Sequence, residues 1–108
     1  ALSVEDKLLK EVFSHIEEHL HDEQFGVEKL SKLAGMSRRH LNNKIKSLTS
    51  QTANELIRNF RLRKAAHLLS DKGLTVSEAC YQAGFNNLSY FSKCFTEFYG
   101  TRPSAYCK

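Results

Sequence analysis

The sequence predicts an all-α fold of about seven helices, in which two similar two-helix units are joined by one long connecting helix. Apolar residues recur mostly at three- to four-residue spacing, which is the period of helices that pack on one face. Small polar residues and glycines at the ends of these apolar runs mark where helices begin and end. One pattern is also written twice, since "AGMSRRHLNNKI" begins at Ala34 and "AGFNNLSYFSKCF" begins at Ala83.

The first helix is predicted to start at Ser3, which forms a capping-box-like pair with Asp6, and to continue to Leu20. Acids and histidines occupy the face opposite its apolar residues, so this amphipathic helix is expected to cover a core. The chain begins with Ala1 rather than Met, and we expect it to be part of a longer protein.

The first of the two units consists of two short helices. The segment Val27–Ala34 predicts one of them, and Gly35 suits the left-handed residue that commonly ends a helix. Ser37 is expected to cap the next helix. The residues expected to be buried are Val27, Leu30 and Leu33 in the first helix and Leu41, Ile45 and Leu48 in the second.

A long connecting helix is predicted between the units. Thr52 and Glu55 have the spacing of a capping box, and the helix that they open should run to about Ser70. Its apolar positions are Leu56, Ile57, Phe60, Ala65, Ala66, Leu68 and Leu69. We therefore expect residues 1–51 to form the N-terminal helix and the first unit, 52–70 the connecting helix, and 71–108 the second unit, all within one domain.

The second unit opens after Gly73. Thr75 and Glu78 form a further capping box for a helix over Val76–Ala83, which stops at Gly84. This short helix corresponds to Val27–Ala34 of the first unit.

The second unit continues with an aromatic-rich helix that Asn86 is expected to cap. Its inward residues should be Phe91, Phe95 and Phe98. Gly100 is expected to end this helix, and Pro103 suits the first position of a last short helix that includes Tyr106.

The two units align residue by residue. Residues 27–37 match residues 76–86 at an offset of 49, and residues 41–56 match residues 91–106 at an offset of 50. The paired residues agree in kind: Gly35 with Gly84, Met36 with Phe85, Leu41 with Phe91, Ile45 with Phe95, Leu48 with Phe98, and Ser31 with Cys80. Two helices joined by a tight glycine turn, the second with a polar outer face, form the pattern of a helix-turn-helix.

Charge is distributed unevenly along the chain, although the formal net charge is only +4. Residues 1–30 contain the acids Glu5, Asp6, Glu11, Glu17, Glu18, Asp22, Glu23 and Glu28. Residues 36–64 contain the bases Arg38, Arg39, Lys44, Lys46, Arg58, Arg61, Arg63 and Lys64, with Glu55 as their single acid. This basic segment favours a polyanion as partner, and on charge alone a solvated basic face explains it equally well.

Other classes of function find little support in the residues. The three cysteines are Cys80, Cys94 and Cys107. They lack the C-x-x-C spacing of zinc or redox sites, and the first two fall within helical patterns as small buried residues do. His15, His19 and Asp22 are the one candidate metal site, and a wet acidic helix face explains them better. We therefore expect no cofactor, no metal, no enzymatic activity, no membrane contact and a cytoplasmic location.

Over nearly all of Phe25–Tyr106 the chain resembles the DNA-binding domain of the AraC/XylS family of bacterial transcription regulators. The most specific part is "VSEACYQAGFNNLSYFSKCFTEFYGTRPSAY", in which Tyr90, Phe91, Gly100 and Pro103 stand at signature positions of the family. The stretch "MSRRHLNNKIKSLTSQTANELIRNFRLRKAAHLL" is similar to the family's first recognition helix and connecting helix. The sequence of this stretch also resembles the C-terminal output domain of hybrid two-component regulators.

This resemblance implies two helix-turn-helix subdomains that bind double-stranded DNA to regulate transcription, with their second helices in successive major-groove segments. The base contacts are expected from Arg39, Asn42 and Asn43 on the first recognition helix and from Leu88, Ser89, Ser92 and Lys93 on the second. Arg39 suits guanine and Asn42 suits adenine, because their side chains can form two hydrogen bonds with those bases. Leu88 fits either a thymine methyl group or the core.

Phosphate contacts are expected from hydroxyl groups, helix N-termini and basic side chains beside the recognition helices. They are Ser37, Arg38, Lys44, Lys46, Thr49, Asn87, Tyr90, Thr101 and Arg102. Two further arginines of the connecting helix, Arg61 and Arg63, suit either phosphate contacts or ion pairs with acids of the first helix.

Two partners beyond DNA follow from the same resemblance: RNA polymerase, and a sensor or receiver domain in the full-length protein. The alternative is a protein-interaction module that docks a sensor or receiver domain and binds no specific DNA. A gel-shift assay separates the two, because only a DNA-binding domain should bind DNA fragments in a salt-sensitive way.

The connecting helix leads to a prediction about the spacing of the DNA target. If it holds both recognition helices against one face of the duplex, the two target elements lie about 10 base pairs apart, and inserting about 5 base pairs turns one element away. Most of the specific affinity should then be lost. Footprinting at one fixed salt concentration measures this. Full affinity with an uninterrupted footprint on the spaced site would contradict simultaneous binding.

Overall fold

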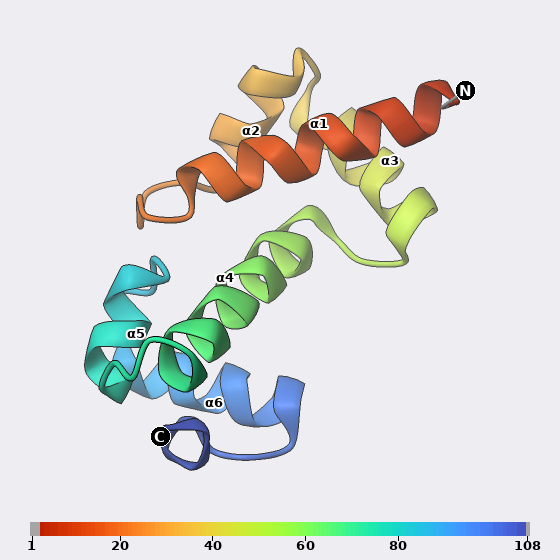
Figure 1. The fold of residues 1–108 in the computed structure, drawn as a ribbon. Coiled ribbons are helices and arrows are strands. Elements are labelled where there is room, and N and C mark those ends of the chain that lie inside the picture. The colour runs from red at the N-terminus through yellow and green to blue at the C-terminus, as the bar shows by residue number, and fades with distance from the viewer. Residues whose placement is uncertain (1–2, 108) are drawn as a thin grey trace. The chain divides into compact units, whose positions relative to one another are not determined.

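The computed structural model describes residues 3–107, and within them the chain is entirely helical. The elements are α1 (Val4–His19), α2 (Val27–Ala34), α3 (Arg38–Thr49), α4 (Ala53–Ser70), α5 (Val76–Gln82), α6 (Leu88–Tyr99) and the 3-10 helix η1 (Pro103–Tyr106) (Figure 1). The all-α prediction of about seven helices is therefore confirmed. No helix among the described residues is long and apolar enough to cross a membrane.

The chain divides into two compact units, residues 1–58 and 59–108. The boundary falls inside α4, so each unit contains one two-helix pair and one part of this helix. The sequence places the helix-turn-helix pairs in the same halves of the chain. The predicted subdivision at residues 51 and 70 remains a prediction.

The core of the first unit is aliphatic. Each of α1, α2 and α3 buries part of the apolar stripe predicted from the sequence, and α2 and α3 both pack on α1. The buried residues are Val12, Ile16, Leu20, Phe25, Leu30, Leu41, Ile45, Ala53, Leu56 and Ile57. The packing of α3 on α1 and α2 leaves the opposite side of α3 in solvent.

The core of the second unit is aromatic. One contiguous cluster joins the second half of α4 to α5 and α6, and its buried residues are Leu62, Ala65, Ala66, Leu69, Ala79, Cys80, Ala83, Phe85, Phe91, Cys94 and Phe95. The ring of Phe91 packs on Phe85 and on Phe95, with centroids 5.0 and 5.6 Å apart. Phe95 also packs on Tyr106 of η1, which closes the end of the cluster.

The turn between the two helices of each unit has the same hydrogen bonds. After α2 the N–H of Gly35 donates to Lys32 O and that of Met36 to Ser31 O, and Gly35 has a φ of +69°. After α5 the N–H groups of Gly84 and Phe85 make the equivalent bonds to Tyr81 O and Cys80 O. This pair of bonds around a left-handed residue is the Schellman motif. The sequence repeat is therefore also a repeat of backbone structure.

The recognition helices α3 and α6 end in a second matched turn. Ser50 and Gly100 are both left-handed, with φ of +61° and +72°, and each N–H donates to the carbonyl four residues earlier. Ser50 is the single non-glycine residue with positive φ among the described residues. It therefore carries backbone strain that Gly100 avoids.

The helix starts follow the predicted caps with one exception. Ser3, Ser37 and Thr75 accept hydrogen bonds from the third residue after them, and both full capping boxes, Thr52–Glu55 and Thr75–Glu78, are formed. The predicted cap at Asn86 is wrong, because the side chain of Asn87 accepts from Tyr90 N at 2.8 Å. The helix thus starts one residue later, which is the residue added between the two units.

Four details of the predicted elements are also corrected. Leu33 is 45% exposed, since Ser31 occupies the buried face of α2 beside Leu30. Phe98 is 40% exposed, because Tyr99 instead packs on Phe95 and Tyr106 at the end of α6. The last helix is a single 3-10 turn, which is the usual form for so short a segment. Val27 and Leu48 are half-buried rather than buried.

The left-handed turns predict opposite effects for two substitutions. Gly84→Val places a β-branched side chain at a φ of +94° and should destabilise the second unit by about 1 to 3 kcal/mol. Ser50→Gly relieves strain in the first unit and should raise stability by up to about 1 kcal/mol. Thermal unfolding of both variants measures this. An unchanged melting temperature for Gly84→Val would show that the turn tolerates side chains.

Candidate nucleic-acid interface

The first recognition helix, α3, presents a polar and basic surface. The hydroxyl of Ser37 accepts from His40 N at 3.1 Å and fixes the helix start, while Leu41 and Ile45 are buried. This orientation leaves the opposite face in solvent. The exposed residues of α3 include Arg38, Arg39, Asn43 and Lys46, and Lys44 is half-buried. Arg39, Asn43 and Lys46 therefore share one accessible face.

Asn42 lies on the same helix but is already engaged within the protein. Its Oδ1 accepts a hydrogen bond from the backbone N–H of Ala53 at 2.8 Å, and the side chain is only half exposed. Thr49 is engaged in a similar way, since its hydroxyl donates to Ile45 O and accepts from Gln51 N. The sequence pattern gave no indication of either contact.

The second recognition helix, α6, presents a smaller and less charged surface. Phe91, Cys94 and Phe95 are buried. The first turn of the helix is exposed at Leu88, Ser89 and Tyr90, and Lys93 follows one turn later, with Ser92 half-buried beside it. Leu88 is 36% exposed, so it lies at the edge of the unit and not within its core.

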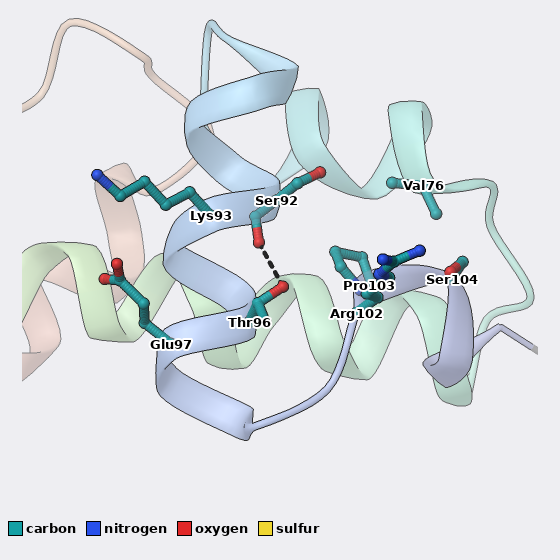
Figure 2. A pocket seen from close by; sticks show the side chains of 8 residues that line it. All are labelled: Val76, Ser92, Lys93, Thr96, Glu97, Arg102, Pro103 and Ser104. Atoms are coloured by element: carbon teal, nitrogen blue, oxygen red, sulfur yellow. Dashed lines mark hydrogen bonds between the residues drawn. The ribbon is translucent and has the colours of Figure 1, made fainter.

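A surface groove runs between α6, the start of α5 and η1 in the second unit. Figure 2 shows Ser92 and Lys93 on α6 along one side of it, with Val76 and the η1 segment opposite. The lining residues are Val76, Ser92, Lys93, Thr96, Glu97, Arg102, Pro103 and Ser104. The charged side chains of Lys93, Glu97 and Arg102 are among the lining residues, although most of the groove surface is apolar.

The first unit has a groove at the matching place. It lies between the start of α2, the recognition helix α3 and the start of α4, and it is lined by Val27, Arg38, Arg39, Asn42, Thr52 and Asn54. Four of these residues correspond through the repeat to residues of the other groove: Val27 to Val76, Asn42 to Ser92, Thr52 to Arg102, and Asn54 to Ser104. In both units the groove therefore lies on the same side of the recognition helix.

The remaining predicted phosphate contacts lie around these helices. Asn87 caps α6, and Tyr90 is 51% exposed with its ring packed on Phe85. Arg102 is exposed just before η1, and Thr101 is half-buried. All four lie at the ends of α6, where a DNA backbone flanking a bound helix would pass.

Arg61 has a structural role that the sequence analysis did not assign. It is only 5% exposed, and its Nη1 donates to the carbonyl of Ala83 at 3.1 Å, at the C-terminal end of α5. A cation at a helix C-terminus is favourable, so this contact secures the turn before α6. In the sequence, Arg61 lies four residues before Ala65 and eight before Leu69, and both of these residues are buried. This helical spacing was the sequence feature that could have indicated the burial of Arg61. Arg63 instead lies over the ring of Phe60.

Among the described residues, no group of histidine, cysteine and acidic side chains could hold a metal ion. Burial raises the pKa of the Cys80 thiol to about 11, so this group is protonated at neutral pH and acts as a packing residue. Cys94 is also buried, as predicted. The ring of His19 stacks on Phe25 and its Nδ1 lies 2.8 Å from His15 O, which explains its position on α1 without a ligand.

Comparison with known proteins supports the same architecture. The model of a protein family described as "Helix-turn-helix domain" matches residues 30–108 of this chain. "Histidine kinase P4" of Formosa agariphila is 42% identical over 104 residues, which are 96% of this chain and 8% of that protein. The chain therefore spans less than a tenth of this curated relative.

Two solved structures have the same fold. The DNA-binding domain of AdpA in complex with a target DNA is 34% identical, with a TM-score of 0.82 over 91% of this chain and 87% of that one. A probable AraC family transcriptional regulator from Rhodopseudomonas palustris is 27% identical, with a TM-score of 0.80 over 93% of this chain and 94% of that one. The chain belongs to the AraC-type family of helix-turn-helix domains.

Proposed function

We propose that this domain binds double-stranded DNA in a sequence-specific way to regulate transcription in bacteria, with α3 and α6 as its recognition helices. One observation carries the proposal: each of two units buries one face of its second helix and exposes a polar face beside a matched groove. An amphipathic helix held across a tight turn is the element that enters the major groove in helix-turn-helix proteins.

The first unit has more side chains with groups that suit hydrogen bonds to bases. Arg39 is exposed and suited to the O6 and N7 atoms of guanine, and Asn43 is exposed beside it. An adenine contact by Asn42 remains a prediction, and its hydrogen bond to Ala53 competes with that contact. On α6 we propose base contacts from Leu88, Ser89, Ser92 and Lys93, in which the leucine suits a thymine methyl group.

Phosphate contacts flank both helices in this proposal. Ser37, Arg38, Lys44, Lys46 and Thr49 serve the first unit, and Asn87, Tyr90, Thr101 and Arg102 serve the second. The hydroxyl of Thr49 already has two partners within α3 and the following turn, so it contributes least. Because four of these nine residues are cationic, affinity should fall steeply with salt.

The wider context is part of the proposal. The similarity to a histidine kinase supports a sensor or receiver domain elsewhere in the full-length protein, with this domain as its output. A transcription regulator of this kind works in the cytoplasm, contacts RNA polymerase, and needs no cofactor or catalytic activity of its own. The DNA-bound relative with 34% identity supports double-stranded DNA as the partner.

The second candidate function is docking of a protein domain without DNA. The exposed acidic face of α1, with Glu5, Asp6, Glu11, Glu17 and Glu18, favours it, because such a face would repel DNA and attract a basic surface. The two functions occupy different helices. The domain can therefore serve both, and DNA binding is the one supported by α3 and α6.

The reading role of α3 is tested by Arg39→Ala. On a target site selected from a pool of random DNA sequences (the selected site), this variant should lose about 1 to 3 kcal/mol of binding free energy and relax preference at one or two base pairs. Arg102→Ala, which removes a phosphate contact, should weaken binding to all DNA alike and lower the salt slope by about one. Lys10→Ala on α1 serves as the matched control and should change neither.

The measurement is anisotropy titration against the selected site and a set of single-base variants at several salt concentrations. If Arg39→Ala weakens all sequences equally, Arg39 is a phosphate contact. If the wild-type chain binds no DNA in a salt-sensitive way, the docking function replaces the proposed one.

A further inference from the structure

We propose that Asn42 is a positioning residue that fastens the recognition helix α3 to the start of α4, and that it reads no base. In the second unit a proline removes the need for this fastening and leaves the matching Ser92 available to DNA. The inference rests on the proposed DNA-binding function for its consequence, but the fastening itself is independent of DNA.

The contact joins two helices across a turn. Asn42 lies in the middle of α3, and its Oδ1 accepts from the N–H of Ala53, the first residue of α4, at 2.8 Å. Ala53 is completely buried, so water does not reach that N–H as an alternative partner. N–H groups in the first turn of a helix have no partner within the helix. Asn42 therefore supplies an acceptor that α4 requires.

The neighbouring groups at the start of α4 are already paired with one another. The hydroxyl of Thr52 accepts from Glu55 N at 3.1 Å, and the Glu55 carboxylate accepts from Thr52 N at 2.9 Å. This capping box satisfies those two donors and not the N–H of Ala53. The side chain of Asn42 supplies the acceptor for that N–H.

This hydrogen bond conflicts with base reading by Asn42. A two-bond contact with adenine requires Oδ1 to accept from N6 while Nδ2 donates to N7. The hydrogen bond to Ala53 holds the amide in one orientation, and any rotation toward a base that moves Oδ1 off this N–H leaves a buried donor without an acceptor, which is unfavourable. Arg39, three residues earlier on the same helix, is exposed, and no such hydrogen bond constrains its side chain.

The second unit shows the same junction without the donor. Through the repeat, Asn42 corresponds to Ser92 and Ala53 to Pro103, the first residue of η1. Proline has no N–H, and it is favoured at the first position of a helix for that reason. Figure 2 shows Ser92 and Pro103 lining the same groove. Pro103 is buried like Ala53, so the two junctions differ in the hydrogen bond and not in burial.

The consequence for function lies in the position of α3. Because Asn42 ties the middle of α3 to α4, it fixes where the exposed neighbours Arg39 and Asn43 are held. Loss of the tie should weaken binding to every sequence by a similar factor. Loss of a base contact should instead change preference at one base pair.

The test is a double-mutant cycle that transplants the junction of the second unit into the first. Asn42→Ser removes the acceptor and leaves the Ala53 N–H unpaired. Ala53→Pro places a ring carbon where the N–H points at Asn42 Oδ1, and should clash with it. Each single variant should melt several degrees lower, about 4 to 8 °C. The double variant carries the Ser–Pro pair of the second unit and should recover most of that loss.

The DNA-binding part uses the same three proteins on the selected site and its single-base variants. Asn42→Ser should bind all sites more weakly by one common factor, with an unchanged order of preference. The double variant should regain wild-type affinity and preference. Amide hydrogen exchange by NMR gives a third readout, in which Ala53 N–H exchanges faster in Asn42→Ser than in the wild type.

Two results would overturn the proposal. Additive losses of stability in the double variant would show that Asn42 and Ala53 do not act as a pair. The second result is that the double variant regains its stability, while both proteins that carry Asn42→Ser change their preference at one base pair. Asn42 would then be a base-reading residue. Should the wild type bind no DNA, the proposed function fails, while the stability cycle still reports on the fastening.

Discussion

The left-handed turn after the first helix of each unit is the constraint on which the rest of the structure depends. At Gly35 the chain reverses through two backbone hydrogen bonds, and Ser37 caps the next helix two residues later. So little chain between two helices leaves only a narrow range of directions for the second. The direction of α3 decides that Leu41 and Ile45 face the core, and hence that Arg39 and Asn43 face solvent.

The second unit repeats this constraint with different side chains. Its core is aromatic where the first is aliphatic, yet the bonds around Gly84 match those around Gly35. At the end of the recognition helices Gly100 replaces the strained Ser50, and at the following junction Pro103 replaces Ala53. Backbone geometry is therefore retained while side-chain chemistry differs. The first unit exposes Arg39, Asn43 and Lys46 on its second helix, and the second unit has a glycine and a proline at the two matching backbone positions.

Most of the fold could be predicted from the sequence because its signals are local. Caps such as Thr75 with Glu78, and a left-handed Gly35, act within a few residues of themselves. The family resemblance then indicated the type of site. The predictions of burial were wrong where a contact with another segment determines which residue is buried. Phe98 has the helical spacing of an inward residue, but the final turn of the chain packs on Tyr99 instead.

The candidate site was less predictable for the same reason. The exposed face of α3 follows from helical periodicity, and Arg39 and Asn43 lie on it as expected. The engagement of Asn42 depends on a backbone N–H eleven residues away, and the burial of Arg61 depends on a carbonyl twenty-two residues away. Each contact joins two different helices, so the periodicity within one helix does not predict it. Only the three-dimensional structure brings these groups together.

The central claim is that both recognition helices, and not the acidic first helix, contact DNA. The most direct measurement is the change in backbone amide chemical shifts when the selected duplex is added to the isotopically labelled chain. The account predicts the largest changes in two stretches, residues 37–46 of α3 and residues 87–93 of α6. Changes confined to α1 and its exposed acids, with α3 and α6 unaffected, would contradict it.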